Sequence, residues 1–407
     1  MGLVVQKFGG SSVANAERIK RAVARAVKAK RAGNRVVVVV SARGDLTDEL
    51  IDLAKQVSDD PPRREMDMLL STGEQQSVAL ATMAVDALGE QAISFAGAQI
   101  GIVTDSFHTK AKIKNIDPSR ITEALDAGKV VIVAGFQGVD ENFNITTLGR
   151  GGSDLTAVAL AAVLKADVCE IYTDVEGIYT ADPRRVTNAR KIPRISYDEI
   201  LELAALGAQV MQARSIEFAK RYGVTIHVRS SFSDNEGTYI VGETPEMEDI
   251  VVSGVALSKS EAKIDFRGIP DRPGIAAKIM GRFSKSGLNV DMIVQTPAVT
   301  GVTDLSLTVG RSELAEAKRI AQLLMTELGG QVVNSEEDIA KLSVVGIGMR
   351  SHTGVAEKMF SALAAENVNI KMISTSEIRI SVIIDEDAAD RALNAVHKAF
   401  ELHKAPA

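Results

Sequence analysis

The sequence is poor in the residues that cross-link or anchor a chain. It has one cysteine, Cys169, among 407 residues, which excludes a disulfide framework and a cysteine-ligated zinc site. No apolar run approaches the roughly 20 residues that span a bilayer, and the N-terminus lacks the basic-then-apolar layout of a signal peptide. The five histidines are scattered without metal-ligand spacing. We therefore expect a cytoplasmic protein without a membrane partner.

The charge is modest and mixed in sign. The formal net charge is −6, with acidic and basic residues interspersed, and the absence of a basic stripe argues against a nucleic-acid partner. Hydrophobic residues make up 45% and charged residues 25%, which is typical of globular domains. A chain of this length suits about two or three domains.

The first part of the chain alternates strand-like and helical segments. Residues 36–40, 130–134 and 168–173 are apolar runs of the kind that form strands buried on both faces. Helical segments, such as 155–165, lie between them. We therefore predict an α/β fold with an open, three-layer, mostly parallel sheet over residues 1–232. The polar, turn-rich stretch 233–249 is predicted to be a linker.

The second part contains an internal repeat. Strand-like residues 262–269 match 340–347, and the sequence after each continues with a glycine-containing loop and a helical segment. We predict two βαββαβ ferredoxin-like domains, residues 250–335 and 336–407. One interpretation is a duplicated dimerisation module. The other is a ligand-sensing pair, because the loop before each helix exposes backbone N–H groups suited to a carboxylate.

Two glycine-rich segments are candidate anion sites. The first, Lys7-Phe8-Gly9-Gly10-Ser11-Ser12, joins a strand to a helix, so the backbone can approach a phosphate closely while Lys7 neutralises its charge. The second, Gly149-Arg150-Gly151-Gly152-Ser153-Asp154, precedes another helix. Arg150 can bind a carboxylate with two hydrogen bonds. Helix capping alone would explain Ser153 or Asp154 but not three glycines and an arginine.

Three further segments are weaker candidates. Residues 41–47 follow the strand 36–40 and place hydroxyl groups at the edge where open α/β sheets bind ligands. Glu74 is a candidate partner for an ammonium group, or else a solvated glutamate near a helix start. Residues 172–184 form a polar loop with two tyrosines, which suits a nucleotide base and ribose but also an ordinary structured loop.

Taken in order, these motifs resemble the aspartokinases, of the amino acid kinase family, and the repeat resembles their tandem ACT domains. The resemblance covers essentially the whole length. It implies a phosphotransferase that uses ATP and Mg²⁺ to phosphorylate the side-chain carboxylate of L-aspartate, giving 4-phospho-L-aspartate. This reaction is the first step towards lysine, threonine and methionine. The acceptor, with a pKa of roughly 4, is already ionised at neutral pH, so no general base is required.

The resemblance also implies residue roles. Lys7 and Asp154 are expected to be catalytic, and no side chain is expected to ligate metal directly. The expected ATP contacts are Lys7, Phe8, Gly9, Gly10, Thr173, Asp174, Tyr179, Asp182 and Arg184. The expected aspartate contacts are Ser41, Thr47, Glu74, Arg150 and Ser153. Gln209 stands where many relatives have a lysine, which leaves that role vacant or taken by another residue.

Lysine, threonine or both are the expected inhibitors, bound at the ACT domains of a homodimer or larger oligomer. The expected effector contacts are Asp271, Pro273, Gly274, Ile275, Ala276, Asn289, Val290, Asp291, Gln295, Asn369, Ile370, Ser376 and Glu377. One alternative is a kinase for glutamate, acetylglutamate or a nucleoside monophosphate. Another is an inactive amino-acid sensor, against which Lys7, Arg150 and Asp154 argue.

Overall fold

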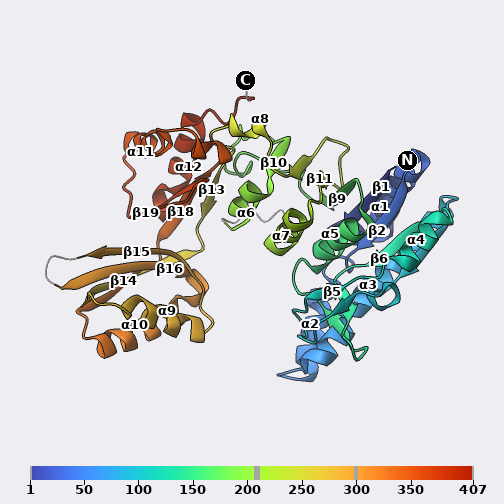
Figure 1. Cartoon of the computed structure of the whole chain (residues 1–407), viewed down its shortest axis with the longest axis horizontal. Coiled ribbons are helices and arrows are strands. Elements are labelled where there is room, and N and C mark those ends of the chain that lie inside the picture. The colour runs from blue at the N-terminus through green and yellow to red at the C-terminus, as the bar shows by residue number, and fades with distance from the viewer. Residues whose placement is uncertain (1, 206–210, 298–300, 406–407) are drawn as a thin grey trace. The chain divides into compact units, whose positions relative to one another are not determined.

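The structure is a computed structural model of the chain and describes residues 2–205, 211–297 and 301–405 (Figure 1). These residues form two compact units. The first comprises residues 2–178, 191–204 and 211–244, and the second comprises residues 179–190, residue 205 and residues 245–405. None of the helices in the described ranges has the length and apolar character needed to cross a membrane.

The first unit is built on an eight-stranded sheet with β1 in its interior. Neighbouring strands are parallel except for the pair β11–β12. In order across the sheet they are β10 (Arg194–Ser196), β12 (Thr238–Val241), β11 (Ile226–Ser230), β9 (Val168–Thr173), β1 (Leu3–Phe8), β2 (Arg35–Val40), β6 (Val130–Ala134) and β3 (Ala92–Phe95). The predicted open α/β sheet is thus confirmed.

Helices cover the sheet and make the outer layers. Val36, Val38 and Val40 of β2 pack in one cluster with residues of α1 and α3, while α5 contacts β1, β2 and β9 and packs against α7. The helices of this unit are α1 (Ala16–Arg31), α2 (Leu46–Val57), α3 (Arg63–Ala87), α4 (Ser119–Asp126), α5 (Gly152–Leu164), α6 (Tyr197–Ala205) and α7 (Ala213–Tyr222).

A small second sheet completes the first unit. Its strands are, in order, β5 (Ile113–Asn115), β4 (Val103–Thr104), β7 (Gln137–Val139) and β8 (Ile145–Thr147). This sheet leads the chain from β6 into α5, because β7 and β8 form a hairpin between them. It therefore precedes the glycine-rich segment at the start of α5.

The second unit contains two four-stranded sheets with helices. The first sheet has the order β15 (Val290–Pro297), β16 (Val302–Gly310), β14 (Glu261–Pro270), β17 (Val332–Glu336), with α9 (Ile275–Lys285) and α10 (Leu314–Leu328). The second has the order β13 (Gly254–Ser258), β18 (Ile339–Val345), β20 (Arg379–Asp385), β19 (Met372–Thr375), with α11 (Val355–Ala365) and α12 (Ala389–Ala399). The first is a contiguous βαββαβ unit, as predicted.

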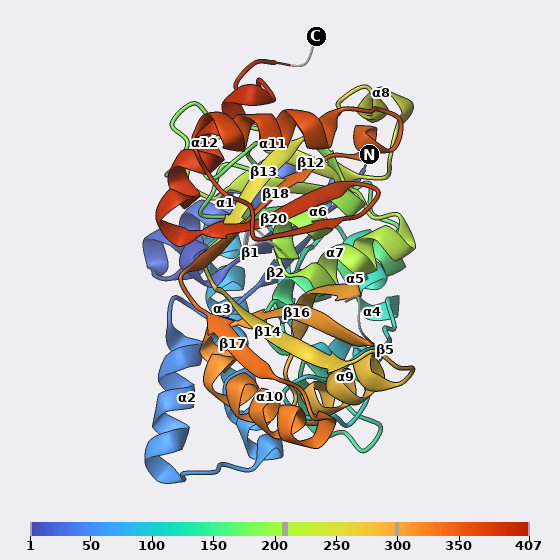
Figure 2. The same ribbon diagram turned by 90° about the vertical axis from the view of Figure 1, so that its left-hand side faces the viewer.

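The second copy is not contiguous, which differs from the prediction. Its edge strand β13 comes from before the first copy and lies next to β18 (Figure 2). The two strands are antiparallel, with Gly254 opposite Val345. Residues 254–258, predicted to belong to the first ferredoxin-like domain (250–335), therefore supply a strand to the second. The predicted linker 233–249 also differs, because it contains β12, which is a strand of the first unit, and the short helix α8 (Pro245–Glu248).

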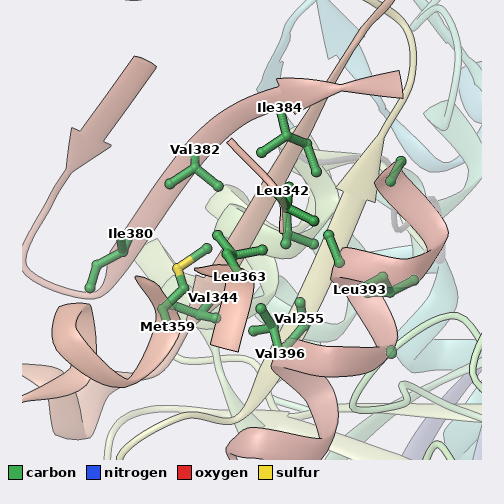
Figure 3. Packing of buried hydrophobic residues seen from close by; sticks show 14 of the residues in the cluster. Val255, Leu342, Val344, Met359, Leu363, Ile380, Val382, Ile384, Leu393 and Val396 are labelled. Carbon is green, nitrogen blue, oxygen red and sulfur yellow. The ribbon is translucent and has the colours of Figure 1, made fainter. Parts of the chain in front are cut away.

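Residues 179–190 leave the first unit and pack with the second copy. Ala181 and Val186 join the core formed by residues such as Leu342 and Met359, part of which is drawn in Figure 3. The hydroxyl of Thr180 bonds Nε2 of His397 on α12 at 3.0 Å. This segment, predicted to belong to residues 1–232, is therefore structurally part of the second unit.

Candidate active site and effector cavity

The carboxyl ends of β1, β2 and β9 meet at one edge of the parallel sheet, where such folds bind ligands. Lys7 lies near the end of β1, and its Nζ is 2.6 Å from Oδ1 of Asp154 in the first turn of α5. Both side chains are about nine-tenths buried, with exposed fractions of 12% and 11%. The structure therefore brings together the two residues predicted to be catalytic.

Glycine allows the loops after β1 and β2 to touch. A Cβ on Gly10 would lie 2.9 Å from the carbonyl oxygen of Gly44 and 3.0 Å from that of Ala42. The N–H of Gly44 donates to the carbonyl of Gly10 at 3.0 Å, and the N–H of Ser41 donates to Phe8 at 3.1 Å. Ser41 therefore lies beside the Lys7 segment at this edge of the sheet.

Glu74 enters this region from α3. Its side chain is 3% exposed, and Oε1 accepts the N–H of Ala42 at 3.0 Å. The second oxygen, Oε2, is buried and has no hydrogen-bond partner among the described residues. Burial raises the pKa of this carboxyl to about 7, although the Ala42 hydrogen bond opposes the rise. A buried carboxylate oxygen without a donor is suited to bind a cationic group.

The glycine-rich segment before α5 forms a tight turn. Gly149 and Gly151 have φ of 78° and 69°, in the left-handed region that favours glycine. Ser153 is buried, and a Cβ on Gly135 would lie 2.6 Å from its Oγ. The side chain of Arg150 is exposed at the turn, so its guanidinium is available to an incoming anion.

The predicted ATP contacts fall into two groups. Thr173 ends β9 in the first unit and Asp174 follows it, with the Thr173 hydroxyl donating to the Asp174 carboxylate at 3.1 Å. Phe8 is fully buried and stacks on Tyr172 with ring centroids 4.7 Å apart. Its side chain is therefore part of the core, and only its backbone is available to a nucleotide.

The remaining predicted ATP contacts, Tyr179, Asp182 and Arg184, lie in the segment that packs with the second unit. Arg184 donates from Nε and Nη2 to the two oxygens of Asp182, both at 3.0 Å, and these hydrogen bonds lower the pKa of Asp182. The pair is local to its loop. Gln209, singled out in the sequence, lies outside the described residues.

Asp67 is missing from the predicted site, although it lies on the same face of α3 as Glu74. It is fully buried and accepts hydrogen bonds from Thr109 and Thr147. Asp67, Ser71 and Glu74 recur at helical spacing, and this spacing of polar residues was the available signal. The spacing alone did not show what these side chains bind, because the partners of Asp67, Thr109 and Thr147, are distant in the sequence.

A cavity of about 370 Å³ lies in the first βαββαβ unit of the second unit. Six of the predicted effector contacts line it: Asp271, Pro273, Gly274, Ile275, Ala276 and Gln295. Asp291, in contrast, forms an ion pair with Lys341 of β18, and it is not in this lining, nor are Asn289 and Val290. Six of the predicted contacts therefore surround one cavity, whereas Asp291, Asn289 and Val290 are not among its lining residues.

The predicted contacts of the second copy lie on its surface loops. Glu377 is 3.4 Å from Nε of Arg350, and the N–H of Ser376 donates to the carbonyl of Arg379 at 2.8 Å. Asn369 is exposed and Ile370 is partly buried before β19. The Ser376 hydrogen bond closes the turn between β19 and β20, and Glu377 in that turn pairs with Arg350.

The comparisons with known proteins agree with this architecture. The amino acid kinase family model matches residues 2–230, and two ACT domain models match residues 265–322 and 342–400. The chain is 52% identical over 403 residues to aspartate kinase Ask_LysC of Stutzerimonas stutzeri, covering 99% of this chain and 98% of that protein. It is 53% identical over 407 residues to the aspartokinase of Mycolicibacterium smegmatis, covering 99% of this chain and 97% of that protein.

A solved structure gives the same result in three dimensions. The structure of Escherichia coli aspartokinase III in complex with lysine and aspartate is 25% identical, with a TM-score of 0.78. The match covers 98% of this chain and 99% of that one. The chain belongs to the aspartate kinase family, with an amino acid kinase domain followed by two ACT domains.

Proposed function

We propose that the protein transfers the γ-phosphoryl group of ATP to the side-chain carboxylate of L-aspartate, producing ADP and 4-phospho-L-aspartate. The observation that carries this proposal is the buried side chain of Glu74. Its Oε1 accepts a hydrogen bond from the loop after β2, and its Oε2 has no hydrogen-bond partner among the described residues. The Lys7 segment contacts that same loop. An acceptor with an ammonium group is therefore proposed to bind beside the phosphate site.

Lys7 is proposed to act on the phosphoryl group. Its ammonium neutralises charge that develops during transfer, and Asp154, at 2.6 Å, holds it in one orientation. The acceptor carboxylate needs no deprotonation, because its pKa is roughly 4. Positioning and electrostatic stabilisation are then sufficient for the step.

Glu74 and Arg150 are proposed to fix the acceptor. Glu74 receives the ammonium group, and the nearby positive charge would return the pKa of Glu74 from about 7 towards its usual range. Arg150, exposed at its turn, binds the α-carboxylate with two parallel hydrogen bonds. Ser41, Thr47 and Ser153 supply hydroxyl groups around the substrate.

Mg²⁺ fits this site as a companion of ATP. Among the described residues no group of three or more His, Cys, Asp or Glu side chains is placed to hold a metal ion. Phosphate oxygens and water are therefore proposed as its ligands, with Asp154 as the nearby carboxylate. Bound there, Mg²⁺ would neutralise charge on the phosphates.

Trapping the acyl phosphate with hydroxylamine tests the reaction. The purified protein with ATP and aspartate is expected to form aspartyl hydroxamate, and with glutamate to form far less. No product with aspartate would sink the proposal, and equal product with glutamate would favour the broader amino acid kinase alternative. A protein that binds lysine but forms no product with either acceptor would be an inactive sensor.

We further propose that lysine, threonine or both inhibit the enzyme from the cavity at residues 271–276. The E. coli protein bound to lysine supports lysine as an effector, and the loop offers backbone N–H groups at the start of α9. The protein is proposed to be cytoplasmic, at least a homodimer through its ACT domains, and to catalyse the entry step to lysine, threonine and methionine.

A matched pair of variants tests this cavity. Asp271→Ala is expected to raise the lysine or threonine concentration that gives half inhibition, while uninhibited activity stays unchanged. Glu316→Ala, on α10 and outside the cavity lining, is the control. Unchanged inhibition in Asp271→Ala, with either effector, would place the effector elsewhere.

A further inference from the structure

The polar face of α3 extends beyond Glu74. Asp67, Ser71 and Glu74 lie along one face of the helix, with 0%, 0% and 3% of their surface exposed. Each holds a different part of the chain. The backbone carbonyl of Ser71 accepts a hydrogen bond from Nε2 of Gln137 at 2.9 Å. Oε1 of Glu74 accepts a hydrogen bond from the backbone N–H of Ala42 at 3.0 Å. This face therefore anchors loops of the first unit.

Asp67 anchors two segments that are distant in sequence. Its carboxylate accepts the N–H of Thr109 at 3.1 Å and the hydroxyl of Thr147 at 2.5 Å, and it bonds Nδ1 of His108 at 2.7 Å. A fully buried carboxylate is expensive unless such donors replace its lost water. Asp67 thus joins residues 105–112 to the end of β8.

Both anchored segments support the turn that carries Arg150. Thr147 is the last residue of β8, shortly before Gly149. A Cβ on Gly149 would lie 3.1 Å from the carbonyl oxygen of Thr109. The N–H of Ala111 donates to the carbonyl of Thr147 at 2.9 Å. The turn therefore rests on the same loop that Asp67 holds from the other side.

We propose that Asp67 is a positioning residue for the amino-acid substrate, which sets the place of Arg150 relative to Glu74. This inference rests on the proposed function, in which those two residues bind the acceptor. Asp67 and Glu74 share one helix, so their separation along its axis is fixed at about 10 Å. A displacement of Arg150 by about 1 Å relative to Glu74 can cost roughly 100-fold in rate. Asp67 is thus proposed to affect aspartate binding by holding the Arg150 turn in place, without itself contacting the substrate.

The threonines of β8 provide a matched test. Thr147 and Thr146 are neighbours and both are buried, but Thr147 bonds Asp67 whereas Thr146 bonds the hydroxyl of Thr104 at 2.7 Å. Steady-state kinetics would compare Thr147→Val and Asp67→Asn with Thr146→Val. The first two are expected to raise KM for aspartate by about tenfold or more, with KM for ATP within about twofold of the parent. Thr146→Val is expected to lower the melting temperature as much as Thr147→Val but to leave both KM values unchanged.

Other outcomes would overturn the proposal. An aspartate KM near the parent value in Thr147→Val and Asp67→Asn would do so, as would an equal rise in Thr146→Val or equal rises in both KM values. If Asp67→Asn does not fold, the two threonine variants decide alone. A parent protein that forms no acyl phosphate from aspartate would overturn the proposed function and this inference together, whereas an active parent with unaffected variants would overturn only the inference.

Discussion

Nζ of Lys7 and Oδ1 of Asp154 lie 2.6 Å apart, although 147 positions separate them in the sequence, and they join the end of β1 to the first turn of α5. The helix N-terminus stabilises the carboxylate, and the carboxylate in turn orients the ammonium group. Because both side chains are largely buried, the pair is held in one arrangement before any ligand arrives.

Replacing Lys7 with alanine is expected to lower kcat by at least about 100-fold, the usual effect of removing one charged group that stabilises a transition state. Asp154→Asn should lower kcat less, because the ammonium remains but is less well oriented. The rate of hydroxamate formation measures both. Lys20→Ala, an exposed lysine on α1, is the control and should retain full rate. A Lys7→Ala protein with undiminished kcat would remove Lys7 from the mechanism.

Gly10→Ala is expected to impair the enzyme through the backbone. The new Cβ would lie 2.9 Å from the carbonyl of Gly44 and 3.0 Å from that of Ala42, so the loops after β1 and β2 must separate. Such overpacking typically costs about 1–3 kcal/mol, and it should lower kcat/KM for aspartate by about tenfold or more. Gly242→Ala is the matched control, because its Cβ would meet nothing within 4 Å. Equal activity of the two variants would show that the loops tolerate separation.

Much of the secondary structure of the first unit could be predicted from the sequence, because it depends on patterns within short stretches of the chain. The apolar run 36–40 forms β2 between two other parallel strands, and each glycine-rich segment does lie between a strand and a helix. Lys7 lies at the carboxyl edge of the parallel sheet, whereas Asp154 reaches that edge from the first turn of α5, which follows β8 of the small second sheet. Local patterning therefore predicted the layers of the first unit, whereas the pairing of Lys7 with Asp154 was implied by the family resemblance.

The elements that were misplaced depend on long-range pairing. β13 and β12 are short strands whose partners, β18 and β11, are chosen by register and packing. Nothing in residues 179–190 alone shows that Ala181 and Val186 enter the core of the second ACT domain. A truncation at residue 244 would therefore expose those side chains as well as remove the ACT domains, so point variants of the effector cavity are the cleaner test of regulation.

Lys341→Ala is expected to destabilise the second unit. Its side chain is 3% exposed and pairs with Glu261 at 3.2 Å and with Asp291, so its removal leaves two carboxylates without their cation. Breaking a buried ion pair costs about 3–5 kcal/mol, and the partial exposure of Asp291 reduces this to about 2–4 kcal/mol. The midpoint of urea unfolding measures the loss. Lys404→Ala, which breaks an exposed pair with Glu401, should leave the midpoint of unfolding nearly unchanged, because solvent screens exposed pairs. Equal effects would mean that the Lys341 cluster contributes little.

Glu74→Gln is expected to affect stability and binding in opposite directions. Burial raises the pKa of Glu74 to about 7 from 4.5, so the folded state holds a proton that the unfolded state releases. This contribution to stability is present below pH 4.5 and is lost as pH rises to 7. At pH 8 the parent therefore has an ionised, poorly solvated carboxylate that the amide variant lacks. Glu74→Gln should raise the melting temperature at pH 8 and change it little at pH 5.

Glu74→Gln should weaken aspartate binding at pH 8, although it raises the melting temperature there. The ionised form of Glu74 is the one that binds an ammonium group, so KM for aspartate in the parent should fall as pH rises from 6 to 8, through the pKa of about 7. In Glu74→Gln the KM should be at least about tenfold higher and should lose this pH dependence. Measuring KM for ATP over the same pH range separates the acceptor from the nucleotide, since only the aspartate KM should change. A Glu74→Gln protein that is stabilised at pH 8 yet keeps the parent's aspartate KM would show that Oε2 is buried without serving the substrate.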